Sequence, residues 1–510
     1  MTDNKPVERS RTVAVVGTGT MGQGIAQVAL VAGHPVRLHD TVPGRARQAA
    51  AAITGRLDRL VEKGRLAPDA RDAATARLYP ADTLDDLADA ALVIEAVVEQ
   101  LPVKQELFAA LEKIVADDCL LATNTSSLSV TAIAGALRLP GRFVGMHFFN
   151  PAPLLPLVEI VSGFATDATA ATRAYATAKE WGKTPVRCTD TPGFIVNRIA
   201  RPFYAEALRL HEERVADPAT IDAVLRECGG FRMGPFELTD LIGQDVNEAV
   251  TRSVWESFYQ DPKFTPSLAQ RRLVESGRLG RKTGQGWYAH ADGAERPQPR
   301  TEAPAPAPAS VTVHGHLGHA EPLVRLIQEA GIKVRRRKHG RHLTLPGGGQ
   351  LGLPDGETVF EYEGDEIIYF DVAHDYTTAT RIALSTAPTT SSETLREAVG
   401  LFQALGKDVT VIGDVPGMIV ARTVAMLIDL AVDAVDRGVA SAEDIDTAMR
   451  LGVNYPAGPS EWAARLGYAY VSELLGALHE RYPTGRYAPC LGLRRMEHEE
   501  RAAMKDQDIR

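Results

Sequence analysis

The sequence predicts an α/β protein with an additional all-α part: a doubly wound parallel sheet, a helical domain, a weaker α/β layer and a second helical copy. Three observations lead to this fold class. A glycine-rich turn joins a β-branched run to a helix near residue 17, strand and helix patterns alternate up to about residue 189, and the helical pattern that follows occurs twice.

Length and composition indicate a folded protein of several domains. The 510 residues exceed the about 250–300 that one hydrophobic core accommodates. Apolar residues make up 45% of the chain and charged residues 24%, as in ordinary globular proteins. The net charge of -9 includes no basic face, so we expect no nucleic-acid partner. The four cysteines lack CxxC spacing, so we expect neither a zinc site nor disulfides, and a cytoplasmic location.

The first element is the segment "RTVAVVGTGTMGQGIAQVALVAGHPVRLHD", residues 11–40. It reads as a strand, a glycine turn, a helix that ends at Gly33 and a second strand that ends before Asp40. Its many glycines and two glutamines argue against a membrane span or a signal peptide. Further strands are expected at 91–97, 119–125 and 142–149, so residues 1–189 are predicted to form a Rossmann-like domain.

A helical domain is predicted next, and it is duplicated. It covers 190–293, and the Pro/Ala-rich segment 294–310 separates it from the rest as a linker. "DTPGFIVNRIARPFYAEALRL" at 190 aligns with "DVPGMIVARTVAMLIDLAVDA" at 414, an offset of 224 residues, and a second match shares that offset. The second helical copy is therefore assigned to 414–510.

Between linker and second copy, residues 311–413 predict a degenerate, Rossmann-like α/β region. A strand, a glycine turn, a helix and a second strand are expected within residues 310–337, and further strands at 366–373 and 407–413. Gly315 and Gly318 are present there, but the full glycine motif is not. His314, His316 and His319 lie in one loop without a carboxylate at ligand spacing, so we expect no metal site.

The glycine turn predicts a dinucleotide site. Gly17 permits the tight turn, Gly19 lets the backbone approach a pyrophosphate, and Gly22 lets helix and strand pack closely. Asp40 is placed to accept hydrogen bonds from a ribose 2′-hydroxyl and to repel a 2′-phosphate, which favours NAD over NADP despite nearby arginines. A structural turn and a solvated acid are the alternatives. The predicted cofactor residues here are Gly17, Thr18, Gly19, Thr20, Met21, Gly22 and Asp40.

His147, in "HFFNPAPLLPLVEIVSG", is the candidate base. An enzyme that oxidises an alcohol with a dinucleotide needs a group to take the hydroxyl proton, and neutral imidazole suits that task. Glu159, isolated in an apolar run, would hold the imidazole in one tautomer. From spacing alone, a hydrogen-bonded core histidine is an equal alternative.

Longer motifs decide between these readings by resemblance. "NTSSL", "GMHFFNPAP", "LVEIVSG", "DTPGFIVNR" and "GPFELTDLIG" resemble the (S)-3-hydroxyacyl-CoA dehydrogenase family from about Val13 to Tyr288. The resemblance implies that His147 is the catalytic base, that Glu159 orients it, and that Ser126 and Asn197 bind the substrate oxygen. It further implies that NAD contacts Glu99, Lys104, Asn150 and Lys282, and that CoA contacts Lys63, Arg65 and Ser126.

Simpler roles stand beside some of these residues. Ser126 could cap the following helix, Asn197 could satisfy helix termini, and Lys63 and Arg65 could be solvated charges. Pro156 stands where many family members carry lysine, and Arg65 where lysine is common; both concern only the acyl and CoA contacts.

The implied reaction is NAD-dependent oxidation of an (S)-3-hydroxyacyl-CoA to the 3-oxoacyl-CoA. The long form is most similar to the branch that acts on 3-hydroxyadipyl-CoA in phenylacetate breakdown, with Arg201 or Arg232 as candidates for a terminal carboxylate. 3-Hydroxybutyryl-CoA is the alternative substrate, and a silent, crystallin-like structural protein is the alternative of another class.

The second copy is expected to lack catalysis, because Asn197 corresponds to Ala421. We expect residues 414–510 to pack on 190–290 as an internal substitute for a dimer partner, which leaves a higher homo-oligomer open. The expected partner is the acyl-CoA substrate, without a membrane.

Overall fold

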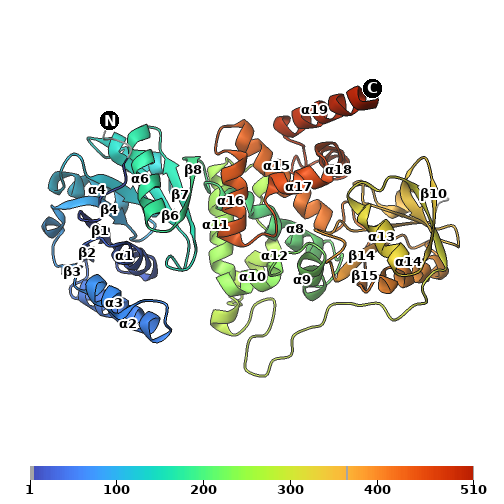
Figure 1. The fold of residues 1–510 in the computed structure, drawn as a ribbon, viewed down its shortest axis with the longest axis horizontal. Coiled ribbons are helices and arrows are strands. Elements are labelled where there is room, and N and C mark those ends of the chain that lie inside the picture. Colours follow the sequence, from blue (N-terminus) through green and yellow to red (C-terminus); the bar gives the residue numbers. More distant parts are fainter. Residues whose placement is uncertain (1–4, 363–365, 509–510) are drawn as a thin grey trace. The chain divides into compact units, whose positions relative to one another are not determined.

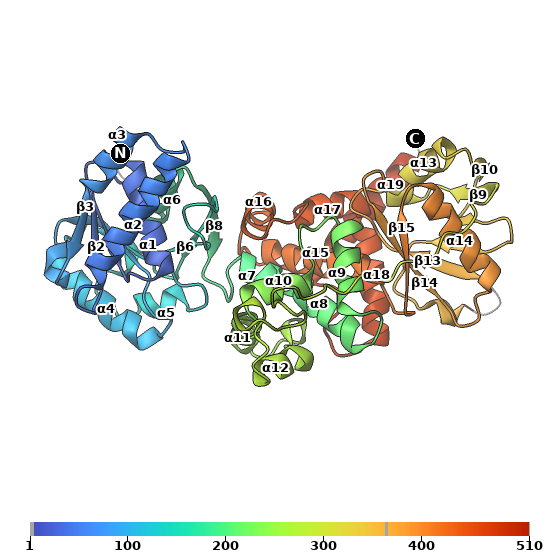
Figure 2. The same ribbon diagram turned by 90° about the horizontal axis from the view of Figure 1, so that it is seen from below.

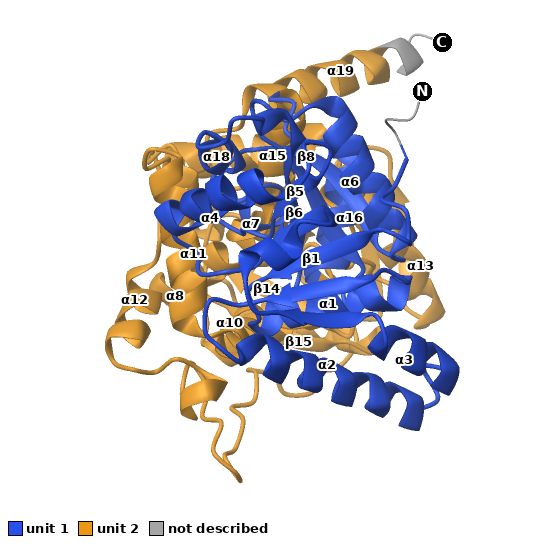
Figure 3. Ribbon diagram, turned by 90° about the vertical axis from the view of Figure 1, so that its left-hand side faces the viewer, with its two compact units in different colours: residues 1–198, 437–453 blue, residues 199–436, 454–510 orange. Residues whose placement is uncertain are grey.

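The computed structural model describes residues 5–362 and 366–508. The chain divides into two compact units, coloured in Figure 3. Unit 1 contains residues 1–198 and 437–453, and unit 2 contains residues 199–436 and 454–510. Among the described residues, no helix combines the length and apolarity that crossing a membrane requires.

Unit 1 is built on an eight-stranded sheet of order β3-β2-β1-β4-β5-β6-β7-β8. All neighbouring strands are parallel except β6 and β7, which pair antiparallel. The predicted doubly wound sheet is thus confirmed, but its last two strands, β7 and β8, run opposite to the others, which the sequence had not indicated. The strands are β1 Thr12–Val16, β2 Val36–His39, β3 Leu78–Ala81, β4 Ala90–Glu95, β5 Leu120–Thr123, β6 Phe143–Phe148, β7 Leu157–Ser162 and β8 Thr184–Thr189.

Helices cover both faces of this sheet (Figures 1 and 2). Side chains alternate along each strand, so Val144, Met146 and Phe148 of β6 join one core with α1, α2 and α6. Phe143 points to the other face, where the ring of Phe108 from α4 meets it edge-on at 4.7 Å. The helices are α1 Thr20–Ala32, α2 Arg45–Glu62, α3 Pro68–Thr75, α4 Leu101–Ile114, α5 Val130–Ala134, α6 Ala168–Glu180 and α7 Val196–Ile199.

A helix from the second helical copy completes unit 1. α16 (Ala442–Val453) packs on β7 and β8, and the N–H of Thr189 donates to the carbonyl of Val439 at 2.9 Å. Gly452 fits there because a Cβ at this position would lie 2.7 Å from Leu157. The edge strand β8 is therefore covered, which prevents it from pairing with another chain.

Unit 2 contains the remaining helices of both copies. α8 and α15 pack on each other, and α15 is almost entirely buried. These helices are α8 Arg201–Glu212, α9 Pro218–Glu227, α10 Pro235–Ile242, α11 Gln244–Ser257, α12 Leu268–Glu275, α15 Val420–Asp436, α17 Pro459–Leu466, α18 Tyr468–Arg481 and α19 Leu491–Asp508.

The second sheet also belongs to unit 2 and has the order β10-β9-β11-β12-β13-β14-β15. It is mixed, since β9/β11, β11/β12 and β13/β14 are antiparallel pairs. The sequence had indicated only four of these strands. The elements are β9 Ser310–Gly315, α13 Pro322–Glu329, β10 Lys333–Arg337, β11 Arg341–Thr344, β12 Gln350–Gly352, β13 Ile367–Phe370, β14 Arg381–Thr386, α14 Ser392–Ala404 and β15 Asp408–Ile412.

The repeat at an offset of 224 residues includes more of the chain than the helical copy. β7 and α6 of unit 1 correspond at this offset to β14 and α14, residue for residue at both ends. β6 and β8 correspond to β13 and β15, which begin at the same offset but end slightly earlier. The repeat therefore includes the last three strands of each sheet.

Candidate active site

The glycine turn has the geometry of a phosphate-binding turn. Gly17 has φ +100°, and a Cβ there would lie 2.4 Å from the carbonyl oxygen of Ala96. A Cβ at Gly22 would lie 1.9 Å from the carbonyl oxygen of Gly17. At Gly19, by contrast, a Cβ would meet nothing within 4 Å. The turn is thus closed toward the protein and open above Gly19, next to the N-terminus of α1, which is where a pyrophosphate fits.

Asp40 lies at the end of β2 and reaches this turn. Its Oδ2 accepts hydrogen bonds from the N–H (3.0 Å) and the hydroxyl (2.5 Å) of Thr18, and its Oδ1 accepts one from the N–H of Val42. Partial burial raises the pKa of Asp40, but the hydrogen bonds from Thr18 and Val42 outweigh it and leave the pKa below its ordinary value. The carboxylate is therefore charged at neutral pH.

His147 and Glu159 stand directly opposite each other on β6 and β7. The reversal of β7 makes them a cross-strand pair on one face, with Nδ1 of His147 2.6 Å from Oε2 of Glu159. His147 is 5% exposed and Glu159 is fully buried. The rings of Phe149 and Phe194 lie 4.5 Å and 5.8 Å from the imidazole.

The second oxygen of Glu159 is held just as firmly. Its Oε1 accepts hydrogen bonds from the N–H groups of Ile195 (3.0 Å) and Val196 (2.9 Å), at the start of α7. The carboxylate thereby compensates the positive end of that helix and cannot rotate away from the imidazole. A carboxylate accepts hydrogen bonds only, so Nδ1 carries the proton and Nε2 presents its lone pair. Among the described residues, no hydrogen bond engages Nε2.

Asn197 and Ser126 are brought together. The side-chain amide of Asn197 donates to the carbonyl oxygen of Ser126 at 3.4 Å, and both residues are partly exposed. Asn124, two residues before Ser126, accepts a hydrogen bond from the N–H of Phe148 at 2.8 Å. This bond ties the loop after β5 to the strand of His147, and Asn124 was not among the predicted residues.

Glu99 and Lys104 belong to a buried network. Oε1 of Glu99 accepts hydrogen bonds from the hydroxyl of Thr125 (2.6 Å) and the N–H of Ser126 (2.9 Å). Lys104, only 1% exposed, donates to Glu95 (2.6 Å) and contacts Glu99 (3.1 Å). Burial raises the pKa of Glu99, but the charge of Lys104 and these hydrogen bonds lower it to about 2. The network fixes the Ser126 loop; Glu95, at the end of a buried strand, was missed.

The remaining predicted residues are more exposed. Asn150 lies at the surface beside the His147 strand. Lys63 and Arg65 follow α2 and are exposed, without an ion pair to any described residue. Lys282 lies in unit 2, where its ammonium pairs with Asp245 at 2.7 Å. The contacts of these four residues with NAD or CoA stay predictions. Within the described ranges, no cluster of three histidines, cysteines or acids could hold a metal ion.

The arrangement can remove a proton from an alcohol. The free Nε2 of His147 is a base of fixed orientation, and the buried carboxylate of Glu159 stabilises the imidazolium that forms. The amide of Asn197 and the Ser126 loop supply hydrogen-bonding groups for an oxygen. The open glycine turn lies on the same sheet as these groups.

Models of known families match most of the chain. The NAD binding domain of 3-hydroxyacyl-CoA dehydrogenase matches residues 12–191, and the C-terminal domain of the same enzyme matches twice, at 193–290 and 417–508. A reduced Rossmann-fold domain of 3-hydroxybutyryl-CoA dehydrogenase matches residues 351–416.

Individual relatives agree. A protein of Escherichia coli K12 named 3-hydroxyadipyl-CoA dehydrogenase is 44% identical over 486 residues, 95% of this chain and 97% of that protein. A probable 3-hydroxybutyryl-CoA dehydrogenase of Deinococcus radiodurans is 41% identical over 276 residues, 54% of this chain and 99% of its own length. A crystal structure described as 3-hydroxybutyryl-CoA dehydrogenase from E. coli K12 has TM-score 0.89 and 42% identity, and the match covers 97% and 99% of the two chains.

Proposed function

The chain belongs to the 3-hydroxyacyl-CoA dehydrogenase family and is an NAD-dependent oxidoreductase of 3-hydroxyacyl-CoA, and on this premise we propose that its substrate is 3-hydroxyadipyl-CoA and that His147 is its base. The observation that carries the assignment of the base is the 2.6 Å contact between His147 and a fully buried Glu159. The relative named 3-hydroxyadipyl-CoA dehydrogenase, which matches nearly the whole chain, supports the substrate.

His147 takes the proton of the 3-hydroxyl on Nε2. NAD, when bound, supplies the acceptor for the hydride that leaves C3. Glu159 keeps Nδ1 protonated and offsets the positive charge of the imidazolium. Because Glu159 is anchored by two backbone N–H groups, the imidazole meets the hydroxyl without having to reorient.

Ser126 and Asn197 hold the oxygen that becomes the ketone. The geometry that supports this role is the 3.4 Å contact of Asn197 with the Ser126 carbonyl, on the loop fixed by Glu99 and Asn124. Hydrogen bonds to a developing carbonyl stabilise the transition state more than the ground state.

The glycine turn and Asp40 hold NAD. The open space above Gly19 accommodates the pyrophosphate, and the N–H groups at the start of α1, among them those of Thr20 and Met21, face it. Asp40 accepts hydrogen bonds from the adenosine ribose hydroxyls through the carboxylate lone pairs that Thr18 and Val42 do not engage.

Arg201 is our candidate receptor for the terminal carboxylate of the adipyl group. It is 5% exposed, donates to the hydroxyl of Thr251 at 3.1 Å, and has a buried Nε without a partner. No described carboxylate forms an ion pair with it, and burial lowers its pKa. A buried cation without a counter-ion is costly, and a carboxylate ligand removes that cost. Arg201 follows Asn197 by four residues and lines a ≈ 290 Å³ pocket with Tyr204.

Two substrates of equal chain length test this proposal. (S)-3-Hydroxyadipyl-CoA and (S)-3-hydroxyhexanoyl-CoA differ only in the terminal carboxylate. We expect wild-type enzyme to prefer the adipyl compound at least about tenfold in kcat/KM, measured by NADH absorbance. In Arg201→Gln, kcat/KM should fall for the adipyl compound and stay unchanged for the hexanoyl compound, so that the preference is lost. Arg232→Gln, at an exposed arginine, should keep the preference.

Two outcomes would correct the assignment in different ways. A wild-type preference for the hexanoyl or butyryl compound would favour 3-hydroxybutyryl-CoA, the second candidate, which the description of the structure with TM-score 0.89 supports. An adipyl preference that survives Arg201→Gln would leave the substrate in place and remove Arg201 from its recognition.

We further propose that the second helical copy serves as an internal partner for the first. Glu206 of α8, fully buried, pairs with Arg422 of α15 (2.8 Å) and with Arg486 (2.5 Å). Lys263 pairs with the buried Asp429 at 2.5 Å. Such buried ion pairs between the copies are typical of a permanent interface rather than of a transient one.

A truncation inside the linker, after Pro304, tests the internal partner. It retains every residue proposed for catalysis and corresponds in length to the relatives that match 54% of the chain. We expect it to dimerise or aggregate, because the face of α8 would be exposed. A truncated protein that is a soluble monomer by light scattering and produces NADH as fast as the full chain would contradict this proposal.

A further inference from the structure

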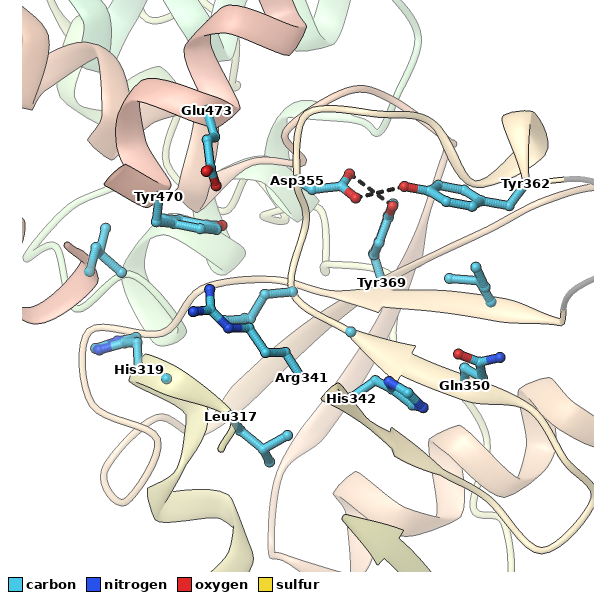
Figure 4. Close-up of a pocket in the computed structure, with 15 residues that line it drawn as sticks. Leu317, His319, Arg341, His342, Gln350, Asp355, Tyr362, Tyr369, Tyr470 and Glu473 are labelled. Carbon is cyan, nitrogen blue, oxygen red and sulfur yellow. Dashed lines mark hydrogen bonds between the residues drawn. The ribbon is translucent and has the colours of Figure 1, made fainter. Parts of the chain in front are cut away.

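The second α/β layer contains a pocket that is lined by none of the residues proposed for the dehydrogenase reaction. It has a volume of ≈ 390 Å³, at the small end of the range of ligand-binding pockets. It opens at the carboxyl end of β9, between the turn at Gly318, the start of β11 and the loop after β12, and α18 closes one side (Figure 4). Ligands of α/β folds bind at this edge of the sheet.

This pocket is not a second dinucleotide site. After Gly315, Leu317 stands at the spacing where unit 1 has the open Gly19, and Leu317 is 4% exposed. The N–H of Leu317 donates to the carboxylate of Glu321 at 2.9 Å, and Arg336 pairs with the same carboxylate. An anion of the protein thus already occupies the position that a pyrophosphate would take.

One cation in the pocket has no counter-ion. Arg341, the first residue of β11, is exposed at the mouth, and its guanidinium points into the space between Tyr470 and His319 (Figure 4). No hydrogen bond or ion pair joins its side chain to a described residue. The segment 333–342, "KVRRRKHGRH", contains six lysines and arginines and no acid, so the field at this edge attracts anions.

Most of the other polar groups that line the pocket are engaged, although the side chains of His342 and Gln350 form no hydrogen bond to a described residue. The hydroxyls of Tyr362 (2.7 Å) and Tyr369 (2.8 Å) both donate to Asp355, and that of Tyr470 donates to the carbonyl of Pro354. Glu473 pairs with Arg501. His319 contacts the carbonyl of Ala373 at 2.6 Å. Beside Arg341 the walls therefore offer mainly rings and aliphatic side chains, including Leu353 and Ile367, with His342 and Gln350 as the remaining hydrogen-bonding side chains.

We propose that this pocket binds a small organic monocarboxylate, whose carboxylate pairs with Arg341 and whose apolar or aromatic body lies against Tyr369 and Tyr470. A guanidinium receives a carboxylate through two parallel hydrogen bonds. The ligand is a monoanion, because a single unpaired cation is available and the carboxylate of Asp355 in the same wall, which pairs with no described cation, disfavours a second negative charge. The site lies wholly in unit 2 and is separate from His147 and Glu159 of unit 1.

Calorimetric titration of the full chain tests the site. The probes are benzoate and hexanoate, with benzamide as the neutral isostere of benzoate, and AMP and inorganic phosphate as dianions. We expect benzoate or hexanoate to bind with a Kd below about 1 mM and benzamide to bind at least about tenfold more weakly. The dianions should not bind through Arg341.

Three variants locate the binding. Arg341→Gln should weaken carboxylate binding at least about tenfold. Arg335→Gln is the matched control, since Arg335 is an exposed arginine on β10 without an ion pair to any described residue and does not line the pocket. Gly352→Leu places a side chain over the ring of Tyr369, 3.9 Å from the new Cβ, and should fill the pocket without altering its charge.

The proposal is overturned if neither carboxylate binds the wild-type chain, or if Arg341→Gln and Gly352→Leu both bind as wild type does. Equal binding of benzamide and benzoate would remove the role of the charge. Tighter, Arg341-dependent binding of AMP or phosphate would overturn the assignment to a carboxylate.

Discussion

The last three strands of the two sheets correspond at an offset of 224 residues, and they differ where the chemistry lies. In unit 1, β6 carries His147 and β7 carries Glu159; at the same positions β13 is followed by Asp371 and β14 carries Ala383. Asp371 accepts hydrogen bonds from the N–H groups of Ile419 (3.0 Å), Val420 (2.8 Å) and Ala421 (3.0 Å). Ile419 and Val420 correspond to the two residues that donate to Glu159.

One backbone requirement is thus met in two ways. In each copy a helix follows a DxPG segment, residues 190–193 or 414–417, and an anion must compensate the unpaired N–H groups at the start of that helix. The second copy supplies it directly from the position of His147, and the neighbouring strand then needs no acid. The first copy supplies it from β7, and the same carboxylate is left with a second oxygen that holds a histidine. The proposed catalytic pair therefore adds a histidine to a carboxylate that already serves as a structural anchor.

The second copy retains several structural contacts of the first copy. Lys183 donates to the carbonyls of Ala152 (2.5 Å) and Leu155 (2.9 Å). Its counterpart Lys407 donates to the two carbonyls at the same offset, those of Tyr376 and Ala379. Phe194 and Met418 share a left-handed backbone, with φ +50° and +51°. These contacts shape the fold, and the second copy keeps them although it lacks the residues that we propose for catalysis.

The largest effect should come from a substitution that breaks the contact between His147 and Glu159 in the first copy. In Glu159→Gln the amide oxygen accepts from Ile195 and Val196, and the amide NH₂ then faces Nδ1 of His147. The histidine must adopt the other tautomer, so Nε2 carries a proton and cannot act as a base. We expect kcat to fall about 10³- to 10⁴-fold. NAD affinity, followed by fluorescence titration, should not change; a loss in kcat of less than about tenfold would return Glu159 to a purely structural role.

The contact between the helical copies should give the next largest effect. At the 224-residue offset Glu206 corresponds to Leu430, so only the first copy supplies this acid. Glu206→Gln leaves Arg422 and Arg486 buried without their anion and should lower the free energy of unfolding by about 3–5 kcal/mol. Urea unfolding measures this change. Glu275→Gln, at an exposed pair with Arg271, should change it by less than about 1 kcal/mol.

The same anion sets a pH dependence. Burial raises the pKa of Glu206, but the charges of Arg486 and Arg422 outweigh it and bring the pKa to about 2. A lowered pKa contributes stability that is complete above the ordinary carboxyl pKa and is lost as the pH falls toward about 2. Wild type should therefore lose this contribution in acid, while Glu206→Gln, which lacks it throughout, should show a shallower decline.

Asp371 should respond in the opposite sense, which sharpens the contrast between the copies. Burial raises its pKa to about 6, although four backbone N–H groups counteract this shift. A raised pKa contributes stability that is present below the ordinary carboxyl pKa and is lost as the pH rises through about 6. Asp371→Asn should remove this slope and, because an amide has one acceptor oxygen, cost about 1–3 kcal/mol. Urea midpoints between about pH 4 and 8 test both effects; an unchanged slope contradicts the assignment to Asp371.

The smallest effect concerns the cofactor. Asp40 follows β2, whereas Lys338 follows β10 in the second layer, which has no acid for a ribose. Asp40→Ala should weaken NAD by about tenfold and reduce discrimination against NADP, since the repulsion of a 2′-phosphate disappears. Asp82→Ala, at an exposed acid paired with Arg47, should leave the KM for NAD within about twofold. A wild-type preference for NADP would contradict the role of Asp40.

The local parts of this protein could be predicted from the sequence. The strand, glycine turn and helix at residues 12–32 follow from periodicity and from backbone conformations that only glycine adopts readily, and they form as expected. The repeated helical segment was found from one constant offset. The suggestion that Glu159 is the partner of His147 came from a charge isolated in an apolar run, a cost that burial makes large.

Tertiary structure decided what depends on residues far apart in the chain. The reversal of β7, which sets His147 opposite Glu159, has no local signal. The contact of Glu206 with Arg422 and Arg486, and the pocket around Arg341, each join segments that periodicity treats as independent. Asp371 is a further example: the sequence places an acid near a strand end but does not indicate which helix this acid anchors. Charges and hydrogen bonds depend on distance in space, and only the packed fold fixes that distance.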